Sequence, residues 1–439
     1  MEVSLLDVLN AREARVRQQQ LLLTEHRAPL LCFTMNIAGP VKTTPLIERG
    51  FRAGLEELDS RLPKEKILFR AAKVLPTGCE GYYAVSMPAP ELKALCTRIE
   101  ENHPLGRLFD MDVIDTDGRK LERQTQRGCI VCGAPGRGCA ASRAHSPEQL
   151  QAVTEQLLTR YFRNRDQEQV AFLAIQSLLD EVRTTPKPGL VDCRNNGSHK
   201  DMDLSLFESS AHALRPYFEE CVRIGQETAH LKPEETFLLL REAGLKAETA
   251  MLRTTGGVNT HKGTIYTLGI LCGSVGRLWS AEHPIAGREE LLKECGNIAR
   301  SSVQADFAGA TGKTTGEQLY LKYGIRGIRG EVAEGLPSVR NIGLPYFQQA
   351  LAEGFSKNDA GVYTLLRLIA NVTDTNLRHR GGEVGARWAA KAARELLSAS
   401  PYPAIRQLEM LDDGFIARNL SPGGCADLLA VTYFLYSLS

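Results

Sequence analysis

The chain has 439 residues, of which 43% are hydrophobic and 24% charged, and its 53 basic and 52 acidic residues leave a net charge of +1. This length exceeds one typical compact core, so we predict two domains, or three. The balanced charge excludes a general electrostatic attraction to nucleic acid or to an anionic membrane, so an anionic ligand must be bound by local clusters of charge.

Hydropathy and cysteine usage favour a cytoplasmic chain. No apolar run approaches the roughly 20 residues that cross a bilayer, and the longest, 265–278, is interrupted by glycines and Arg277. The first residues place acids and bases at helical spacing, unlike a signal peptide. The eleven cysteines are scattered except for one group, which indicates reduced thiols. We expect neither a membrane nor a nucleic-acid partner.

Residues 1–165 are predicted to form a small α+β domain. After a first helix, strands and helices follow in the order β-α-β-β-α-β, the split βαβ or ferredoxin-like pattern. A polar run at 164–169 is interpreted as the linker to the second domain. The predicted helices cover 4–23, 46–58, 90–99 and 146–161, and the predicted strands cover 30–37, 67–74, 82–85 and 108–114.

Two acids on the last predicted strand suggest a metal site. Asp110 and Asp112 are two residues apart, so both carboxylates face the same side of a strand. Paired carboxylates suit Mg²⁺, which bridges to substrate phosphates. Arg107 and His103, just upstream, are predicted to hold phosphate oxygens. A solvated edge strand with alternating acids is the alternative.

The closely spaced cysteines suggest a second, structural metal site. Cys129, Cys132, Cys139 and His145 supply three thiols and an imidazole, which is a complete tetrahedral zinc set. Four protein ligands leave no open position, so the zinc would be structural. The alternative is three free thiols in a polar loop.

Residues 166–439 show long helical periodicity and no convincing strand, which predicts an all-α domain. The predicted helices cover 167–183, 205–227, 233–251, 263–279, 288–305, 344–354, 358–368, 384–397 and 426–438. Six polar, glycine-bearing loops separate them, at 185–192, 195–203, 254–263, 326–335, 373–383 and 419–429. Because loops carry function more often than cores do, we expect one cleft for a polyanionic, sugar-bearing ligand. Six ordinary solvated connections are the alternative.

The third of these loops runs directly into an apolar helix. Asn259, Thr260, His261 and Lys262 lie at the expected helix start, where unpaired N–H groups can bind an anion such as phosphate. Lys262 adds a full charge, and His261 adds a group that titrates near neutrality. The alternative is a helix that is merely capped by Asn259 or Thr260.

A segment at 308–315, A-G-A-T-G-K-T-T, is similar to a phosphate-binding P-loop. That motif requires glycine where this chain has Phe307, and no strand precedes it. A Walker A site is therefore improbable, and a local phosphate contact by Lys313 stays open.

Both halves resemble known enzyme families. The N-terminal half resembles the holo-acyl-carrier-protein synthase of citrate lyase, which is also called apo-citrate lyase phosphoribosyl-dephospho-CoA transferase. The segments that carry this resemblance are 33–42, 103–113 and the cysteine–histidine set. The C-terminal half resembles triphosphoribosyl-dephospho-CoA synthase, and the segments that carry this are 185–192, 257–263, 329–331, 374–376, 380–383 and 419–429. The order matches the fused, bifunctional version of these enzymes.

The resemblance implies two consecutive reactions. ATP and 3′-dephospho-CoA first give 2′-(5″-triphosphoribosyl)-3′-dephospho-CoA with release of adenine. The product is then transferred as its phosphoribosyl ester to a serine of the citrate lyase acyl-carrier subunit, with release of pyrophosphate. The first reaction needs a general base, groups that stabilise an oxocarbenium-like transition state, and positive charges that neutralise a triphosphate.

Under this resemblance, the catalytic groups of the synthase half are Asp192, His261, Glu331 and Asp374, and Mg²⁺ is expected on Asp374 with Glu331. Asp201 and Asp427 are further carboxylates that suit a base or a metal ligand. The expected substrate and phosphate contacts are Lys187, His199, Lys200, Asn259, Thr260, Lys262, Arg329, Asn376, Arg380, Ser421, Gly423 and Gly424.

For the second reaction, Mg²⁺ bound by Asp110 and Asp112 is expected to assist the attack on the phosphate. Arg107 would neutralise the negative charge that develops as pyrophosphate leaves. Lys42 is a further phosphate ligand under the resemblance, whereas zinc at the cysteines follows from spacing alone.

Three other functions remain open at this stage. The parallel malonate decarboxylase system uses the same prosthetic group on a different carrier protein. An all-α, acid-rich cleft also suits a nucleotide or ADP-ribose glycohydrolase, and a nucleotide-binding regulatory protein without turnover is the third.

Overall fold

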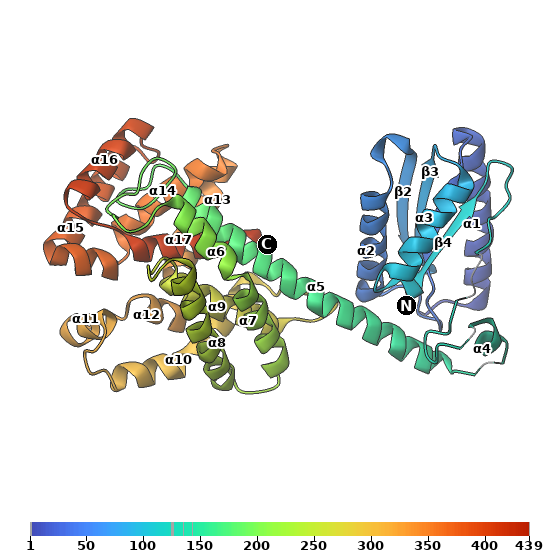
Figure 1. The fold of residues 1–439 in the computed structure, drawn as a ribbon, viewed down its shortest axis with the longest axis horizontal. Helices are drawn as coiled ribbons and strands as arrows, with labels where there is room; N and C mark the ends of the chain where they lie inside the picture. The colour runs from blue at the N-terminus through green and yellow to red at the C-terminus, as the bar shows by residue number, and fades with distance from the viewer. Residues whose placement is uncertain (1, 124–126, 135, 143, 439) are drawn as a thin grey trace. The chain divides into compact units, whose positions relative to one another are not determined.

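The computed structural model describes residues 2–123, 127–134, 136–142 and 144–438. The chain divides into two compact units, Met1–Arg165 and Asp166–Ser439, hereafter the N-terminal and C-terminal units. Helix α5 (Pro147–Arg183) runs through the boundary between them (Figure 1). This boundary lies within the predicted linker at 164–169, as expected, but the segment is helical and does not separate two helices. Arginine, glutamine and glutamate are good helix formers, and no proline or glycine ends the helix there.

The N-terminal unit contains a four-stranded antiparallel sheet in the order β2-β3-β1-β4. Its elements follow each other along the chain as α1, β1, α2, β2, β3, α3 and β4, in agreement with the predicted β-α-β-β-α-β order. The bounds are α1 Leu5–His26, β1 Leu30–Met35, α2 Pro45–Arg61, β2 Ile67–Leu75, β3 Gly78–Val85, α3 Ala89–Asn102, β4 Phe109–Ile114 and α4 Gly136–Ser142.

Alternating side chains give this sheet two different faces. On one face, Phe33 and Phe109 pack against each other, and Phe33 stacks on Phe51 of α2 at 5.0 Å. On the other face, Cys32 of β1 joins an apolar cluster with Leu22 of α1. Figure 1 shows α1 and α2 on opposite sides of the sheet.

Helices build the C-terminal unit, and no strand is assigned within its described residues, 166–438. Short helices α11, α12 and α16 were not predicted, and the loop at 326–335 contains α12. The predicted helix at 205–227 is two helices, because Pro216 lies in the first turn of the second one. The bounds are α6 Leu204–Ala213, α7 Arg215–Thr228, α8 Pro233–Thr254, α9 Lys262–Leu278, α10 Arg288–Ala308, α11 Thr315–Tyr323, α12 Gly327–Ala333, α13 Leu344–Ala352, α14 Lys357–Asn371, α15 Thr375–Ala399, α16 Ile405–Ala417 and α17 Gly423–Ser437.

Helix α9 lies at the centre of this unit and is buried from Thr264 to Gly276 apart from Tyr266. The glycines that interrupt its apolar run permit a close approach to α7. A Cβ at Gly276 would lie 2.1 Å from the carbonyl oxygen of Val222, and one at Gly225 would lie 2.1 Å from that of Gly273. This contact fixes the C-terminal half of α9 against α7.

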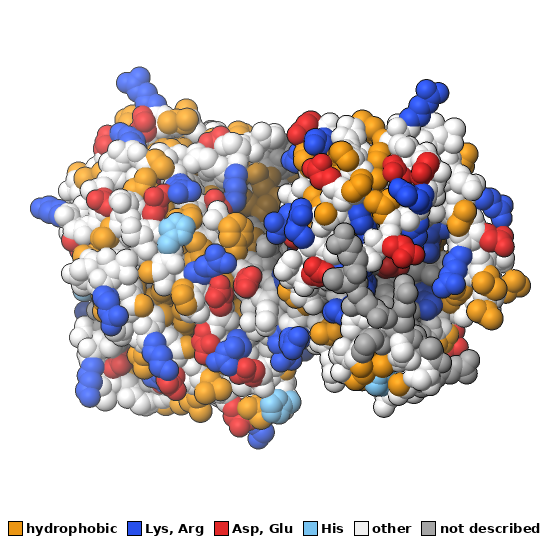
Figure 2. All heavy atoms as spheres, turned by 45° about the vertical axis from the view of Figure 1, so that its right-hand side comes forward, with side chains coloured by type: hydrophobic (Ala, Val, Ile, Leu, Met, Phe, Trp, Pro, Cys, Tyr) orange, Lys and Arg blue, Asp and Glu red, His pale blue; other side chains and the backbone are white. Residues whose placement is uncertain are grey.

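The surface agrees with the balanced composition. Figure 2 shows basic and acidic side chains interspersed over the visible face, with small hydrophobic areas between them. Among the described residues, no helix combines the length and the apolar character that crossing a membrane requires.

Candidate active site

A cavity of about 730 Å³ in the C-terminal unit collects segments from all six predicted polar loops. Its wall is formed by the end of α5 and the segment after it, by the starts of α9, α15 and α17, and by α12. The predicted site residues that line it are Lys187, His199, Asn259, Thr260, His261, Lys262, Glu331, Asp374, Asn376, Arg380, Ser421, Gly423 and Gly424. One cavity thus unites side chains that are far apart in the sequence.

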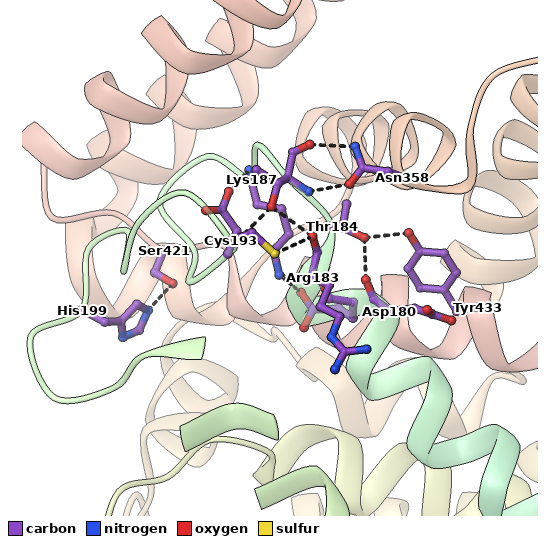
Figure 3. Close-up of polar contacts among 12 residues, drawn as sticks. Asp180, Arg183, Thr184, Lys187, Cys193, His199, Asn358, Ser421 and Tyr433 are labelled. Atoms are coloured by element: carbon purple, nitrogen blue, oxygen red, sulfur yellow. Dashed lines mark hydrogen bonds and ion pairs between the residues drawn. The ribbon is translucent and has the colours of Figure 1, made fainter. Parts of the chain in front are cut away.

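The segment after α5 is fixed to the helices around it (Figure 3). The side chain of Asn358 exchanges two hydrogen bonds with the backbone of Thr185, at 2.9 and 2.8 Å. Thr184 Oγ1 lies 2.7 Å from the hydroxyl of Tyr433. The fully buried carboxylate of Asp412 accepts a backbone hydrogen bond from the segment at 2.8 Å. These anchors come from α14, α16 and α17, and the sequence carried no local signal for them.

Asp192, expected as a catalytic carboxylate, does not line the cavity. Its two oxygens accept hydrogen bonds from the backbone N–H groups of Lys187, Arg194 and Asn195, at 2.8, 2.7 and 3.0 Å. A carboxylate with three backbone donors stabilises the turn that it closes. The structure therefore places Asp192 outside the cavity, where it shapes the segment that carries Lys187.

Three predicted phosphate-binding cations have other surroundings. Lys200 is exposed and does not line the cavity. Arg329 lines a second cavity of about 200 Å³ and lies 3.6 Å from Asp306. Lys262 lines both cavities, and its Nζ pairs with Glu248 at 2.9 Å. Acidic side chains of the protein therefore already compensate the last two of these charges.

Lys187 is almost completely buried at the cavity wall, with 1% of its surface exposed. Its Nζ donates to the carbonyl oxygen of Glu181 at 2.7 Å and pairs with the carboxylate of the same residue. Burial raises the pKa of Glu181, whereas Lys187 lowers it. Glu181 was missed because it lies in the last turn of a helical pattern that carries no motif.

His261 is the imidazole of the cavity wall that keeps a ring nitrogen without a hydrogen-bond partner among the described residues. It is 3% exposed, its Nδ1 lies 2.9 Å from Ser210 Oγ, and its Nε2 has no hydrogen-bond partner among the described residues. Burial, with a smaller contribution from Lys187, lowers its pKa to about 3, so the ring is neutral. The helix-capping alternative holds only for Asn259, whose side chain accepts from Lys262 N–H at 3.2 Å.

The two carboxylates expected to bind Mg²⁺ are already engaged in hydrogen bonds. Asp374 accepts from the backbone N–H groups of Asn376, Leu377 and Cys425, at 2.7, 2.9 and 2.8 Å. Glu331 accepts from both the backbone and the hydroxyl of Ser338. A carboxylate can accept about four hydrogen bonds, so Glu331 retains about two free sites. Asp374 retains fewer, because the Cys425 thiol also forms a hydrogen bond with it.

Asp427, by contrast, makes no hydrogen bond with the described residues and lines the same cavity. Its carboxylate lies against the first turn of α9, where a Cβ at Gly263 would lie 1.9 Å from Asp427 Oδ2. Burial, followed by the charges of Glu181 and Asp374, raises its pKa well above the usual range. Among the acidic residues that line this cavity, Asp427 is therefore the one whose carboxylate keeps its full binding capacity.

The P-loop-like segment has the structure that its sequence indicated. Helix α10 ends at Ala308, and the following turn leads into α11 without a strand in the described residues. The backbone N–H groups of Thr311 and Lys313 donate to the carboxylate of Glu317, at 3.1 and 3.0 Å. An acidic side chain of the protein itself therefore occupies these donors.

In the N-terminal unit, Asp110 and Asp112 face the same side of β4, as predicted. Asp112 pairs with Lys120 at 2.5 Å, whereas Asp110 has no hydrogen bond or ion pair among the described residues. Desolvation by surrounding side chains, followed by the charge of Asp112, raises the pKa of Asp110. Two carboxylates that repel each other in this way fit a divalent cation.

The other predicted residues of this unit make separate contacts. His103 packs against Phe109 at 4.8 Å, on the sheet face opposite Asp110, and burial lowers its pKa. Arg107 donates to a backbone carbonyl oxygen of the cysteine-bearing segment. Lys42 donates to a carbonyl oxygen at 2.5 Å, and burial lowers its pKa. The structure therefore places His103 away from the two carboxylates.

The cysteine–histidine set is brought together in space. The ligand atoms of Cys129, Cys132, Cys139 and His145 all lie within 4.8 Å of one another. Cys132 Sγ is 3.5 Å from Cys139 Sγ and 3.3 Å from His145 Nε2. Backbone N–H groups of Cys132 and then Val131 lower the pKa of Cys129, which favours a thiolate. Bonds of about 2.3 Å to a tetrahedral zinc ion require this spacing.

Comparisons with known proteins agree with both halves of the chain. The family described as ATP:dephospho-CoA triphosphoribosyl transferase (CitG) matches residues 167–439, and that of apo-citrate lyase phosphoribosyl-dephospho-CoA transferase (CitX) matches 3–161. Protein CitXG of Haemophilus influenzae is 36% identical over 99% of this chain and 96% of its own length. Protein CitXG of Leuconostoc mesenteroides is 32% identical over 99% and 97%. A 2-(5''-triphosphoribosyl)-3'-dephosphocoenzyme-A synthase of Klebsiella pneumoniae is 43% identical over 61% of this chain and 90% of its own length. The chain therefore belongs to the CitXG family, with a CitX segment followed by a CitG segment.

Proposed function

We propose that this chain makes and attaches the prosthetic group of citrate lyase. In the C-terminal unit, ATP and 3′-dephospho-CoA give 2′-(5″-triphosphoribosyl)-3′-dephospho-CoA and adenine. In the N-terminal unit, the phosphoribosyl-dephospho-CoA group passes to a serine of the apo acyl-carrier subunit, and pyrophosphate leaves. The matched families support both steps. The description of the CitX family names citrate lyase, which favours this system over malonate decarboxylase.

One observation carries the first assignment: a single cavity contains a neutral imidazole with a free nitrogen, His261 Nε2, and an unpartnered carboxylate, Asp427. In the reaction, the ribose 2′-oxygen of dephospho-CoA forms a bond to the anomeric carbon of the ATP ribose, and the bond from that carbon to adenine breaks. His261 Nε2 accepts the proton of the 2′-hydroxyl. The imidazolium then gives this proton up as the departing adenine takes up one, directly or through water, so the protons balance and His261 returns to its neutral form. A bound triphosphate would raise the pKa of His261 from its low value in the empty cavity.

Mg²⁺ is proposed for both units and would neutralise phosphate charge. In the cavity, Asp374, Glu331 and Asp427 all lie near the Cys425 thiol, whose pKa burial and these carboxylates raise. None of the three pairs with a basic side chain among the described residues. Asp427 would be the principal ligand, with Asp374 and Glu331 contributing their remaining lone pairs. In the N-terminal unit, Asp110 and Asp112 would hold the ion.

Incubation of the protein with ATP, Mg²⁺ and dephospho-CoA is expected to release adenine only when all three are present. The physical reason is that the attacking hydroxyl belongs to dephospho-CoA and not to water. Chromatography of the products, with and without dephospho-CoA, measures this directly. Adenine release without dephospho-CoA would assign a glycohydrolase instead, and binding of ATP without any release would assign a regulatory protein.

We also propose that the cysteine–histidine set of the N-terminal unit holds a structural Zn²⁺. Metal-washed protein is expected to retain about one zinc per chain by elemental analysis, because closed four-ligand sites bind zinc tightly. Cys132→Ser should lose the metal, whereas Cys193→Ser, which alters an exposed thiol of the C-terminal unit, should retain it. Less than about 0.2 zinc per washed chain would reject the site.

All eleven cysteines are free, which fits the reducing cytoplasm that we propose as the location.

A further inference from the structure

Arg380, His199 and Ser421 form a chain of hydrogen bonds at the cavity wall. Arg380 Nη2 lies 3.1 Å from His199 Nδ1, and His199 Nε2 lies 2.9 Å from Ser421 Oγ. Figure 3 shows the second of these contacts, with the imidazole directed at the hydroxyl. The same guanidinium also donates to the carbonyl oxygen of Ser198 and to the side chain of Asn419. Arg380 therefore holds these loops together with three of its five N–H donors.

The chemistry of the donors fixes the direction of this chain. A guanidinium has no acceptor, so Arg380 must donate and His199 Nδ1 must accept. A neutral imidazole carries one N–H, which is therefore on Nε2, and this N–H donates to Ser421 Oγ. Burial, followed by the charge of Arg380, lowers the pKa of His199 to about 4, which keeps the ring in this state near neutral pH.

Ser421 is left with a hydroxyl hydrogen that has no acceptor among the described residues. The residue is 3% exposed and lines the cavity. Next to it, the backbone N–H groups of Gly423 and Gly424 begin α17 and also lack acceptors there. A Cβ at position 423 would lie 2.3 Å from Asn376 Nδ2, so a larger residue there would displace the Asn376 side chain. Several donors without acceptors thus face one part of the cavity.

We propose that Ser421 donates its hydroxyl hydrogen to a phosphate oxygen of a nucleotide substrate, and that His199 is the positioning residue that orients it. The N–H groups of Gly423 and Gly424 complete this subsite, since a helix start favours anions. The proposal deepens the proposed function and rests on it. It also excludes a Ser421–His199 nucleophile–base pair, because His199 Nε2 donates to the serine and cannot accept its proton.

Binding measurements on the full chain test the proposal and identify the phosphate. Ser421→Ala is expected to weaken binding of one probe about ten- to hundredfold, as for a lost hydrogen bond to a charged group. The probes are inorganic tripolyphosphate, which represents ATP, and dephospho-CoA, both measured by calorimetry. If Ser421→Ala loses affinity for only one probe, the phosphate that Ser421 contacts belongs to the substrate which that probe represents. Ser398→Ala, on the exposed side of α15, is the matched control and should change neither affinity.

A second variant separates positioning from a structural role. His199→Gln retains an N–H donor near the position of Nε2 and should keep affinities within about threefold of the wild type, whereas His199→Phe, which lacks the donor, should resemble Ser421→Ala. Between pH 5 and 8, the wild type and His199→Gln should show pH profiles of the same shape. Unchanged affinities for both probes in a folded Ser421→Ala variant would overturn the proposal. So would a covalent adduct on Ser421 in mass spectra. Both readouts stand independently of adenine release, which tests the proposed function itself.

Discussion

His261→Asn is expected to slow adenine release about 10²- to 10⁴-fold, the usual contribution of a general base. Asparagine places a polar atom near Nδ1 and so keeps the hydrogen bond to Ser210, but it has no group at the position of Nε2. Because His261 is neutral and buried in the folded protein, the substitution removes a proton acceptor without removing a charge. The fold and the affinity for dephospho-CoA should therefore change little.

Single-turnover release of adenine, measured with saturating ATP and dephospho-CoA, checks this expectation. His261→Gln, whose side chain reaches the position of Nε2 but is not basic, should be equally slow. His212→Asn is the matched control, since it alters an exposed histidine on α6 and should leave the rate unchanged. If His261→Asn turns over at the wild-type rate, the imidazole only fills space at the helix start and another group accepts the proton.

Asp110→Asn is expected to lower transfer to the acyl-carrier subunit by about 10²- to 10³-fold, the range for loss of one electrostatic group at a transition state. The carboxylate has no partner among the described residues and repels Asp112, so its replacement should not destabilise the fold. Adenine release should be unaffected, because the proposed synthase groups all belong to the C-terminal unit.

Two assays on one preparation separate the activities: chromatographic detection of adenine, and mass spectrometry of the carrier protein after addition of the purified intermediate. Asp117→Asn is the matched control, because it removes one charge from the neighbouring turn and keeps an oxygen that accepts from Arg119. If adenine release and transfer fell together in a folded Asp110→Asn protein, the assignment of the two reactions to separate units would be wrong.

The sequence predicted the elements that depend on local patterns. Strand alternation and turn residues placed all four strands, and helical periodicity identified the long helices of the C-terminal unit. Prediction from the sequence failed where the local pattern was compatible with more than one structure. The polar run at 164–169 resembled a linker, although its residues are compatible with the helix that continues through it. The short helices α11 and α12 lie in glycine- and charge-rich stretches, where the helical pattern is brief. Helix α16, by contrast, has a clear amphipathic pattern that the prediction missed.

The roles of the carboxylates could not be assigned in the same way. Asp192, Asp374 and Asp427 all lie in polar, glycine-bearing loops, and residue type alone does not distinguish them. The difference lies in their hydrogen bonds. Asp192 and Asp374 accept hydrogen bonds from backbone N–H groups, whereas the Asp427 carboxylate accepts none from the described residues. Whether a neighbouring backbone donor points at a given oxygen depends on distant segments of the chain.

The sequence by itself determined the family, the two kinds of unit and the set of polar loops, because motifs and periodicity are local properties. Only the tertiary structure decided which groups in those loops are free to act. Ion pairs with Glu181 and Glu248 compensate Lys187 and Lys262, and Arg380 fixes the tautomer of His199. His261 keeps an unpartnered nitrogen. The physical reason is that availability to a substrate is what remains after the folded chain has satisfied its own donors, acceptors and charges.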